Sequence, residues 1–202
     1  MKRINEREDQ INFIGSWIIS NDKLFKNLIN YFEENPQLHR QGVMGGGRNL
    51  NLDKKKTTEI SIDPINLEDK THSIFYEYFN ELFDCYNDYK DQWPFLKEKL
   101  PVVDIPSFNL QRYLAGDHFS QVHTERISKS NMHRVFAWMT YLNDLEKNAN
   151  GHTNFTHYGL KIKPSKGKTL IWPAEWTHAH AGETLIKGRK YIITGWFCFP
   201  FD

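Results

Sequence analysis

The spacing of apolar residues divides the chain into a helical first half and a second half of short strands. In the first hundred residues, apolar side chains recur every three or four positions over 23–34 and 67–91, which predicts two helices. From residue 101 onward, short runs rich in β-branched and aromatic residues alternate with turn residues, which predicts strands. The fold class we expect is therefore an all-β core with flanking helices (α+β).

The first half adds a strand and a short helix to these two helices. Residues 11–20 are apolar and β-branched, which predicts a strand. Asn21 or Asp22 can cap the helix at 23–34, and a proline shortly after that helix ends it. A short further helix is predicted at 95–100. We expect these elements to brace one side of a sheet.

The segment 41–56 separates the two long helices and has a different composition. It contains three consecutive glycines and a run of three lysines. The glycines lack the strand-to-helix context and the GK[ST] sequence of a phosphate-binding loop. We therefore expect residues 41–56 to form a mobile lid over the functional site, and the lysines at 54–56 to be a solvated turn.

The second half is expected to supply the core of the fold. Seven short strands after a helical front predict a jelly roll backed by helices. We expect all 202 residues to form one domain, in which residues 1–100 brace a jelly-roll core at 101–202. The strands are predicted at 107–113, 119–125, 134–143, 160–163, 169–172, 178–181 and 191–199.

Charge and cysteine content narrow the class of protein. The net charge is +1, from 26 basic and 25 acidic residues, which does not favour a nucleic-acid or membrane partner. The first residues lack the apolar segment of a signal peptide, and no apolar run is long enough to span a bilayer. Two cysteines give no disulfide framework. These features predict a soluble, cytoplasmic protein, and they leave the oligomeric state open.

Two short stretches carry the candidate chemistry. His123 and Glu125 are two positions apart, so on a strand both side chains project from the same face. An isolated pair of this kind is usually a surface feature, but His180 from a distant strand would add a third ligand. Two histidines and one carboxylate form the facial triad that binds Fe(II) and leaves three positions open.

A basic residue lies at a suitable distance from this triad. A bidentate 2-oxo acid can occupy two of the open iron positions and O2 the third, and the remote carboxylate of the acid then needs a cation. Lys190 lies ten residues after His180, across a turn at Gly188, and can form a charged hydrogen bond with that carboxylate. Alternation along the strand places Lys190 inward and Arg189 outward.

Other histidines compete with this assignment. His178 would share the face of His180 on a strand and is the rival ligand. The register between His180 and Lys190 favours His180, so we place His178 second, at the rim of the metal site. We expect His133, His152 and His157 to be ordinary surface or loop histidines.

Several motifs of the second half are similar to one enzyme family. Over residues 107–200 the chain resembles the prolyl 4-hydroxylase group of the 2-oxoglutarate- and Fe(II)-dependent dioxygenases, and the combination of motifs is more specific than any one alone. The motifs are Tyr113-x-x-Gly116-Asp-x-Phe119 before His123, Tyr141-Leu-Asn-Asp144, Gly151-His-Thr153-Asn-Phe155, Lys163-Pro-x-x-Gly167, His180-x-Gly182, Lys190-Tyr191 and Gly195-Trp196.

The resemblance implies a double-stranded β-helix and a set of cofactors. Iron would bind to the triad, and 2-oxoglutarate would bind to Lys190 with help from Tyr113 and Thr153. The family couples the oxidative decarboxylation of 2-oxoglutarate, which yields succinate and CO2, to hydroxylation of an unactivated C–H bond by O2. Ascorbate commonly keeps the iron reduced.

The sequence also departs from the family pattern. Glu125 stands where the family usually has Asp, the spacing from Tyr113 to His123 is one residue longer than expected, and His152 replaces an acidic residue. The leading hypothesis is hydroxylation of a prolyl residue in a peptide. One alternative keeps the cofactors but uses a free amino acid or another small molecule as substrate. A second alternative is a non-catalytic jelly-roll module that only binds.

Overall fold

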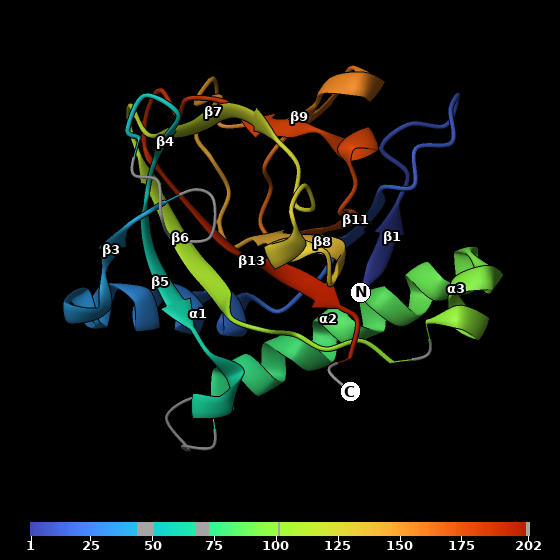
Figure 1. Cartoon of the computed structure of the whole chain (residues 1–202). Helices are drawn as coiled ribbons and strands as arrows, with labels where there is room; N and C mark the ends of the chain where they lie inside the picture. Colours follow the sequence, from blue (N-terminus) through green and yellow to red (C-terminus); the bar gives the residue numbers. More distant parts are fainter. Residues whose placement is uncertain (44–50, 68–72, 101, 201–202) are drawn as a thin grey trace.

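The chain folds into two antiparallel β-sheets with helices beside the larger sheet. A computed structural model describes residues 1–43, 51–67, 73–100 and 102–200. In Figure 1 the smaller sheet lies above the larger sheet, and the long helices run below the larger sheet. This sheet-rich architecture agrees with the expected β core.

Within the described residues, eight strands form the larger sheet and five form the smaller one. The order in the larger sheet is β1 (Lys2–Ile4), β2 (Gly15–Ile18), β11 (Lys168–Pro173), β8 (Arg134–Tyr141), β13 (Arg189–Cys198), β6 (Phe108–Leu114), β5 (Thr58–Ile62) and β3 (Arg40–Gln41). The order in the smaller sheet is β10 (Leu160–Ile162), β9 (Thr153–Phe155), β12 (His180–Gly182), β7 (His118–His123) and β4 (Lys55–Lys56).

In the part of the chain that the structure describes, three α-helices flank the sheets: α1 (Asp22–Glu34), α2 (Ser73–Gln92) and α3 (Pro94–Lys99). The Asn21 side chain caps α1 by accepting a hydrogen bond from the backbone N–H of Leu24. The aromatic face of α2 packs against the larger sheet, where the rings of Tyr86 and Phe197 lie 4.6 Å apart. The predicted helices at 23–34 and 95–100 therefore form almost as expected.

The larger sheet separates two apolar clusters. One cluster fills the space between this sheet and the helices, and the other lies on the opposite face, toward the smaller sheet. Strand β13 shows the division, because Ile193 belongs to the first cluster and Ile192 to the second. Side chains of β13 that share the face of Ile192 therefore point between the sheets.

Some elements differ from the sequence-based expectations. The lysine run is not a solvated turn, because Lys55 lies on β4 and is buried beside Glu59. The helix expected from residue 67 begins at Ser73, and residues 68–72 lie outside the described part of the chain. The expected lid at 41–56 includes residues 44–50, which also lie outside the described part of the chain. Strands β1, β3, β4, β5 and β9 were not expected, because they are short or lack a clear alternation.

Two further observations concern the whole chain. Cys85 and Cys198 are both buried and free. Within the described residues, none of the helices combines the length and the apolar character needed to cross a bilayer.

Candidate metal and co-substrate site

The two histidines and the glutamate of the predicted triad lie together. His123 ends β7 and His180 begins β12, and these two residues are direct partners in the smaller sheet. The Oε1 atom of Glu125 lies 3.7 Å from His123 Nε2 and 3.5 Å from His180 Nε2. All three ligand atoms lie within 4.8 Å of one another, which is close enough for a single ion to contact them.

The hydrogen bonds of the two imidazoles determine which nitrogen can bind a metal. His123 Nδ1 lies 2.8 Å from the carbonyl oxygen of Gln121, and His180 Nδ1 lies 2.9 Å from that of His178. A carbonyl oxygen only accepts, so each Nδ1 carries the ring proton. Each Nε2 then keeps its lone pair, and both face the Glu125 carboxylate. Ring orientation of this kind by an outer hydrogen bond is typical of metal-binding histidines.

Glu125 reaches the site from a connection rather than from a strand. The strand predicted at 119–125 ends at His123, and the backbone N–H of Glu125 donates to the carbonyl oxygen of Ala174. Strand alternation therefore does not aim this side chain, and that part of the expectation is wrong. Instead, Trp196 Nε1 donates to Glu125 Oε2 at 2.7 Å, which leaves Oε1 toward the histidines.

The protonation of these groups suits a divalent cation. Burial, together with the neighbouring His123, lowers the pKa of His180 to about 4. Burial also lowers the pKa of His123. For Glu125, burial opposes ionisation, but His123, His180, Trp196 and Arg134 together hold its pKa below the usual value. Two neutral imidazoles and one carboxylate are therefore available near neutral pH.

His178 is not one of the residues whose ligand atoms form this cluster. It ends a 3₁₀ turn, Trp176–His178, rather than sitting on β12, so it does not share the face of His180. Its buried ring contacts another part of the chain, with Nε2 2.8 Å from the carbonyl oxygen of Asn12. The expectation of a second-ranked ligand at this position is therefore wrong.

Lys190 lies on β13, directly opposite Tyr113 of β6. Its side chain is buried, whereas Arg189 is exposed, as the alternation predicted. Lys190 Nζ donates to the carbonyl oxygen of Gly151 at 3.0 Å and lies 4.3 Å from the centre of the Tyr113 ring. Burial lowers the pKa of Lys190 to about 8, and Glu183 opposes this shift. Lys190 is thus a buried ammonium at neutral pH.

The other two predicted side chains are also buried in this region. Thr153 lies on β9 and shares a 2.6 Å hydrogen bond with the hydroxyl of Tyr141. The Tyr113 hydroxyl donates to Gln111 Oε1 at 2.8 Å. Tyr141 is not among the predicted site residues, although it opens the Tyr-Leu-Asn motif.

The metal ligands and Lys190 lie on different sheets but face the same apolar cluster. The His180 ring lies 5.5 Å from Phe155 and 5.1 Å from Trp172, which both belong to the cluster between the sheets. Tyr113, beside Lys190, belongs to the same cluster. The histidines and Lys190 therefore border one apolar cluster between the sheets, which aromatic side chains shield.

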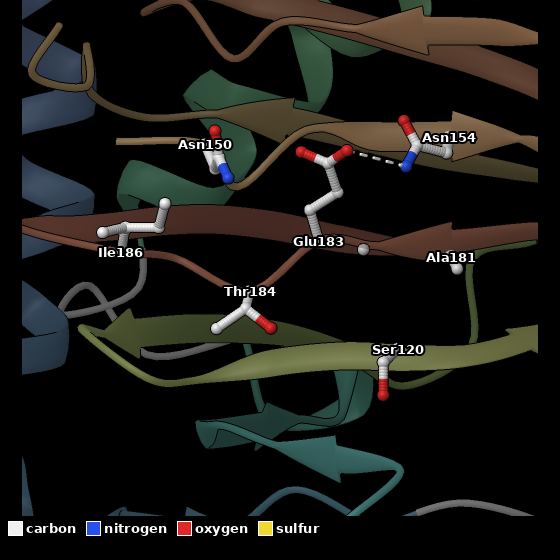
Figure 2. A pocket seen from close by; sticks show the side chains of 8 residues that line it. Ser120, Asn150, Asn154, Ala181, Glu183, Thr184 and Ile186 are labelled. Carbon is white, nitrogen blue, oxygen red and sulfur yellow. Dashed lines mark hydrogen bonds between the residues drawn. The ribbon is translucent and has the colours of Figure 1, made fainter. Parts of the chain in front are cut away.

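A separate hollow of about 460 Å³ lies on the outer face of the smaller sheet (Figure 2). Ser120, Asn154 and Ala181 line it, and alternation turns their neighbours Phe119 and His180 to the other face. Figure 2 shows Glu183 accepting a hydrogen bond from Asn154. This hollow is therefore not part of the histidine and glutamate cluster.

Comparison with known proteins supports the same chemistry. Residues 108–198 match the family model described as the 2OG-Fe(II) oxygenase superfamily. No curated protein matches the chain.

Solved structures share the fold at low sequence identity. A prolyl-4-hydroxylase from Pseudomonas putida has a TM-score of 0.72 and 14% identity, over 93% of this chain and 94% of that one. The viral collagen prolyl hydroxylase from Paramecium Bursaria Chlorella virus-1, solved with 2OG, has a TM-score of 0.66 and 16% identity, over 92% and 95%. A prolyl hydroxylase from Trichoplax adhaerens, in complex with a peptide of hypoxia inducible factor, has a TM-score of 0.66 and 14% identity, over 91% and 83%. At such identities, the likeness shows the fold alone.

Proposed function

We propose that the chain is a dioxygenase that hydroxylates a prolyl residue in a peptide, because residues 108–198 match the model of the 2OG-Fe(II) oxygenase superfamily. Its co-substrates are 2-oxoglutarate and O2, and its metal is Fe(II). The observation that carries the proposal is the cluster of His123, Glu125 and His180, with both Nε2 lone pairs facing a carboxylate oxygen.

The donor set fits a ferrous ion. We assign His123, Glu125 and His180 as its three ligands, because two histidines and a carboxylate on one side of the metal leave room for substrates. When bound, Fe(II) supplies the O2 activation that links decarboxylation of 2-oxoglutarate to hydroxylation of a C–H bond. The protein contributes binding, orientation and the exclusion of water.

Lys190 is assigned to the remote carboxylate of 2-oxoglutarate. Its ammonium is buried and has a single hydrogen bond among the described residues, to the carbonyl oxygen of Gly151, so it can donate others. Thr153 and Tyr113 are buried in the same region, and we assign them to the co-substrate site as well. Phe155 and Trp172 beside His180 keep this space apolar, which strengthens charged hydrogen bonds inside it.

The arrangement of the sheets supports a finer description of the fold. We assign the two sheets as a double-stranded β-helix, or jelly roll, within a single domain of residues 1–202. In this assignment residues 1–100 brace the larger sheet, and α2 contributes aromatic contacts such as that between Tyr86 and Phe197. The prolyl hydroxylases named above, which share the fold, are the reason for preferring a peptidyl proline as substrate.

Two other functions remain as alternatives in the test. A free amino acid or another small molecule could replace the peptide, with the same cofactors and with ascorbate as reductant. A module that holds a metal or a glycan without turnover is disfavoured, because loss of activity usually removes a metal ligand or the co-substrate cation first, and this chain has the full ligand set and Lys190.

Two measurements test the proposal. The first is succinate formation from 2-oxoglutarate with Fe(II), ascorbate and O2, for which the matched control is His180→Ala. Absence of succinate from the unmodified protein would leave only the binding module. The second is mass spectrometry of a proline-rich peptide library, in which the proposed substrate class gains one oxygen. Succinate formation without any modified peptide would favour a small-molecule substrate.

A further inference from the structure

Glu125 is the one predicted metal ligand that lies outside the strands, and three hydrogen bonds hold it in place. Its backbone N–H donates to the carbonyl oxygen of Ala174 at 3.2 Å. Its own carbonyl oxygen accepts a hydrogen bond from Arg134 Nη1 at 3.2 Å. Its Oε2 atom accepts a hydrogen bond from Trp196 Nε1 at 2.7 Å. The backbone and the carboxylate of Glu125 are therefore fixed separately.

The side chains of Arg134 and Trp196 form one unit beside this carboxylate. They come from β8 and β13, which are neighbouring strands of the larger sheet. The guanidinium carbon of Arg134 lies 3.5 Å from the centre of a Trp196 ring, and Nη1 lies 3.6 Å from Glu125 Oε2. Because a cation on the face of an indole attracts its π electrons, Arg134 makes the Trp196 N–H a stronger donor.

The contacts of Arg134 indicate what places its guanidinium. Its Nε atom is buried and has no hydrogen-bond partner among the described residues. The guanidinium is therefore held by stacking on Trp196 and by its two contacts with Glu125. All of these contacts converge on the same ligand.

We propose that Trp196 and Arg134 are positioning residues of the metal site, which engage one oxygen of Glu125 so that the other oxygen faces the ion. This inference rests on the proposed function. Oε1 lies 3.7 Å and 3.5 Å from the Nε2 atoms of His123 and His180, whereas Oε2 is committed to the indole. A glutamate loses much rotamer freedom when it is ordered, and a fixed Oε2 means that this cost is met before the metal binds.

The length of the side chain makes this support specific for glutamate. An aspartate is one methylene shorter, which is about 1.5 Å. With one oxygen at the ion, its other oxygen would lie too far from Trp196, because hydrogen bonds rarely exceed about 3.2 Å. Trp196 therefore supports metal binding only while residue 125 is a glutamate. A tryptophan that merely packed against the site would support either acid equally.

The first experiment is a calorimetric titration of the metal-free protein with Mn(II), a redox-stable stand-in for Fe(II). Trp196→Phe removes the N–H and keeps an aromatic ring, and it should weaken Mn(II) binding about tenfold. Arg134→Met should weaken it less, because the indole N–H remains. In a Glu125→Asp background, Trp196→Phe should cause no further loss. Trp17→Phe is the matched control, since it removes an indole hydrogen bond of the same length, 2.7 Å, to Asp88 Oδ2, and should leave Mn(II) affinity unchanged.

A second experiment applies even if Trp196→Phe does not fold. The indole N–H proton resonance of Trp196 in the metal-free, ¹⁵N-labelled protein reports on its hydrogen bond. This resonance should lie downfield in the unmodified protein and should move upfield in Glu125→Asp. The resonance of Trp17 is the internal control and should not move.

The outcomes separate this inference from the proposed function. An equal loss of Mn(II) affinity from Trp196→Phe in both backgrounds would overturn it and indicate packing alone. Unchanged affinity in the folded Trp196→Phe protein, or a Trp196 resonance that does not respond to Glu125→Asp, would overturn it as well. Failure of the unmodified protein to bind Mn(II) would instead contradict the proposed function.

Discussion

The two sheets are supported very differently, and each carries one part of the proposed site. The larger sheet has an apolar cluster on both faces, one toward the helices and one toward the smaller sheet. Among the described residues, the smaller sheet contributes to such a cluster on its inner face, and its outer face includes the half-exposed Val122 and the hollow of Figure 2. Lys190 lies on the first sheet, and the two histidines lie on the second.

This difference indicates how the site is held together. The larger sheet is fixed by packing, so the position of Lys190 follows from the alternation of β13. The histidines lie on short strands of the smaller sheet and depend on their neighbours, such as the stacked rings of Phe119 and His123 at 3.8 Å. Glu125 links the two, because its carboxylate faces the histidines and accepts a hydrogen bond from Trp196 of the larger sheet.

The largest expected losses of activity come from substitutions of the metal ligands on the smaller sheet. His123→Ala and His180→Ala should each abolish succinate formation, since either change removes one of two imidazoles from the metal site. His178→Ala should retain substantial activity, because that ring is bonded to Asn12. Metal content and succinate yield, measured together in the three variants, check both expectations. Loss of iron in the His178 variant and its retention in the His180 variant would reverse the assignment.

Substitution of Glu125, which links the two sheets, should affect iron binding and turnover nearly as strongly. Glu125→Ala should weaken iron binding and stop turnover, because two neutral imidazoles hold a divalent cation poorly without a carboxylate. Glu125→Asp, which is one methylene shorter, should retain only part of both properties. Iron titration and succinate formation measure the two effects. If Glu125 only paired with a surface cation, the alanine variant would keep the affinity and turnover of the unmodified protein.

The contrast between the sheets also explains what the sequence could and could not predict. Alternation along β13 correctly placed Lys190 inward and Arg189 outward, because successive side chains of a regular strand point to opposite faces. The same rule failed for Glu125 and His178, which lie just outside short strands, in a connection and a 3₁₀ turn. The burial of Lys55 could not be predicted either, because its partner Glu59 becomes visible only when β4 and β5 are placed on different sheets.

On the larger sheet, a change at Lys190 should affect the co-substrate and spare the metal. Lys190→Met removes a charged hydrogen bond, which contributes about 1.5–3 kcal/mol, so 2-oxoglutarate affinity should fall roughly tenfold to a hundredfold. Iron affinity should change little, because the ligands lie on the other sheet. Arg189→Ala is the matched control and should have a mild effect, since its side chain is exposed. An equal or larger loss at Arg189 would contradict the inward placement of Lys190.

The smallest expected effect is a dependence of co-substrate binding on alkaline pH. Burial lowers the pKa of Lys190 to about 8, so its ammonium is present below that pH and is lost as the pH rises through it. Affinity for 2-oxoglutarate should therefore be full near pH 7 and should fall above pH 8, by at most about tenfold per pH unit for one proton. Lys190→Arg replaces the ammonium by a guanidinium that stays charged over this range, so affinity in that variant should not change with pH. Calorimetric titrations of the anaerobic Fe(II) protein between pH 7 and pH 9 compare the two. The same decline in both proteins would place the titrating group elsewhere, on the metal side of the site rather than on the larger sheet.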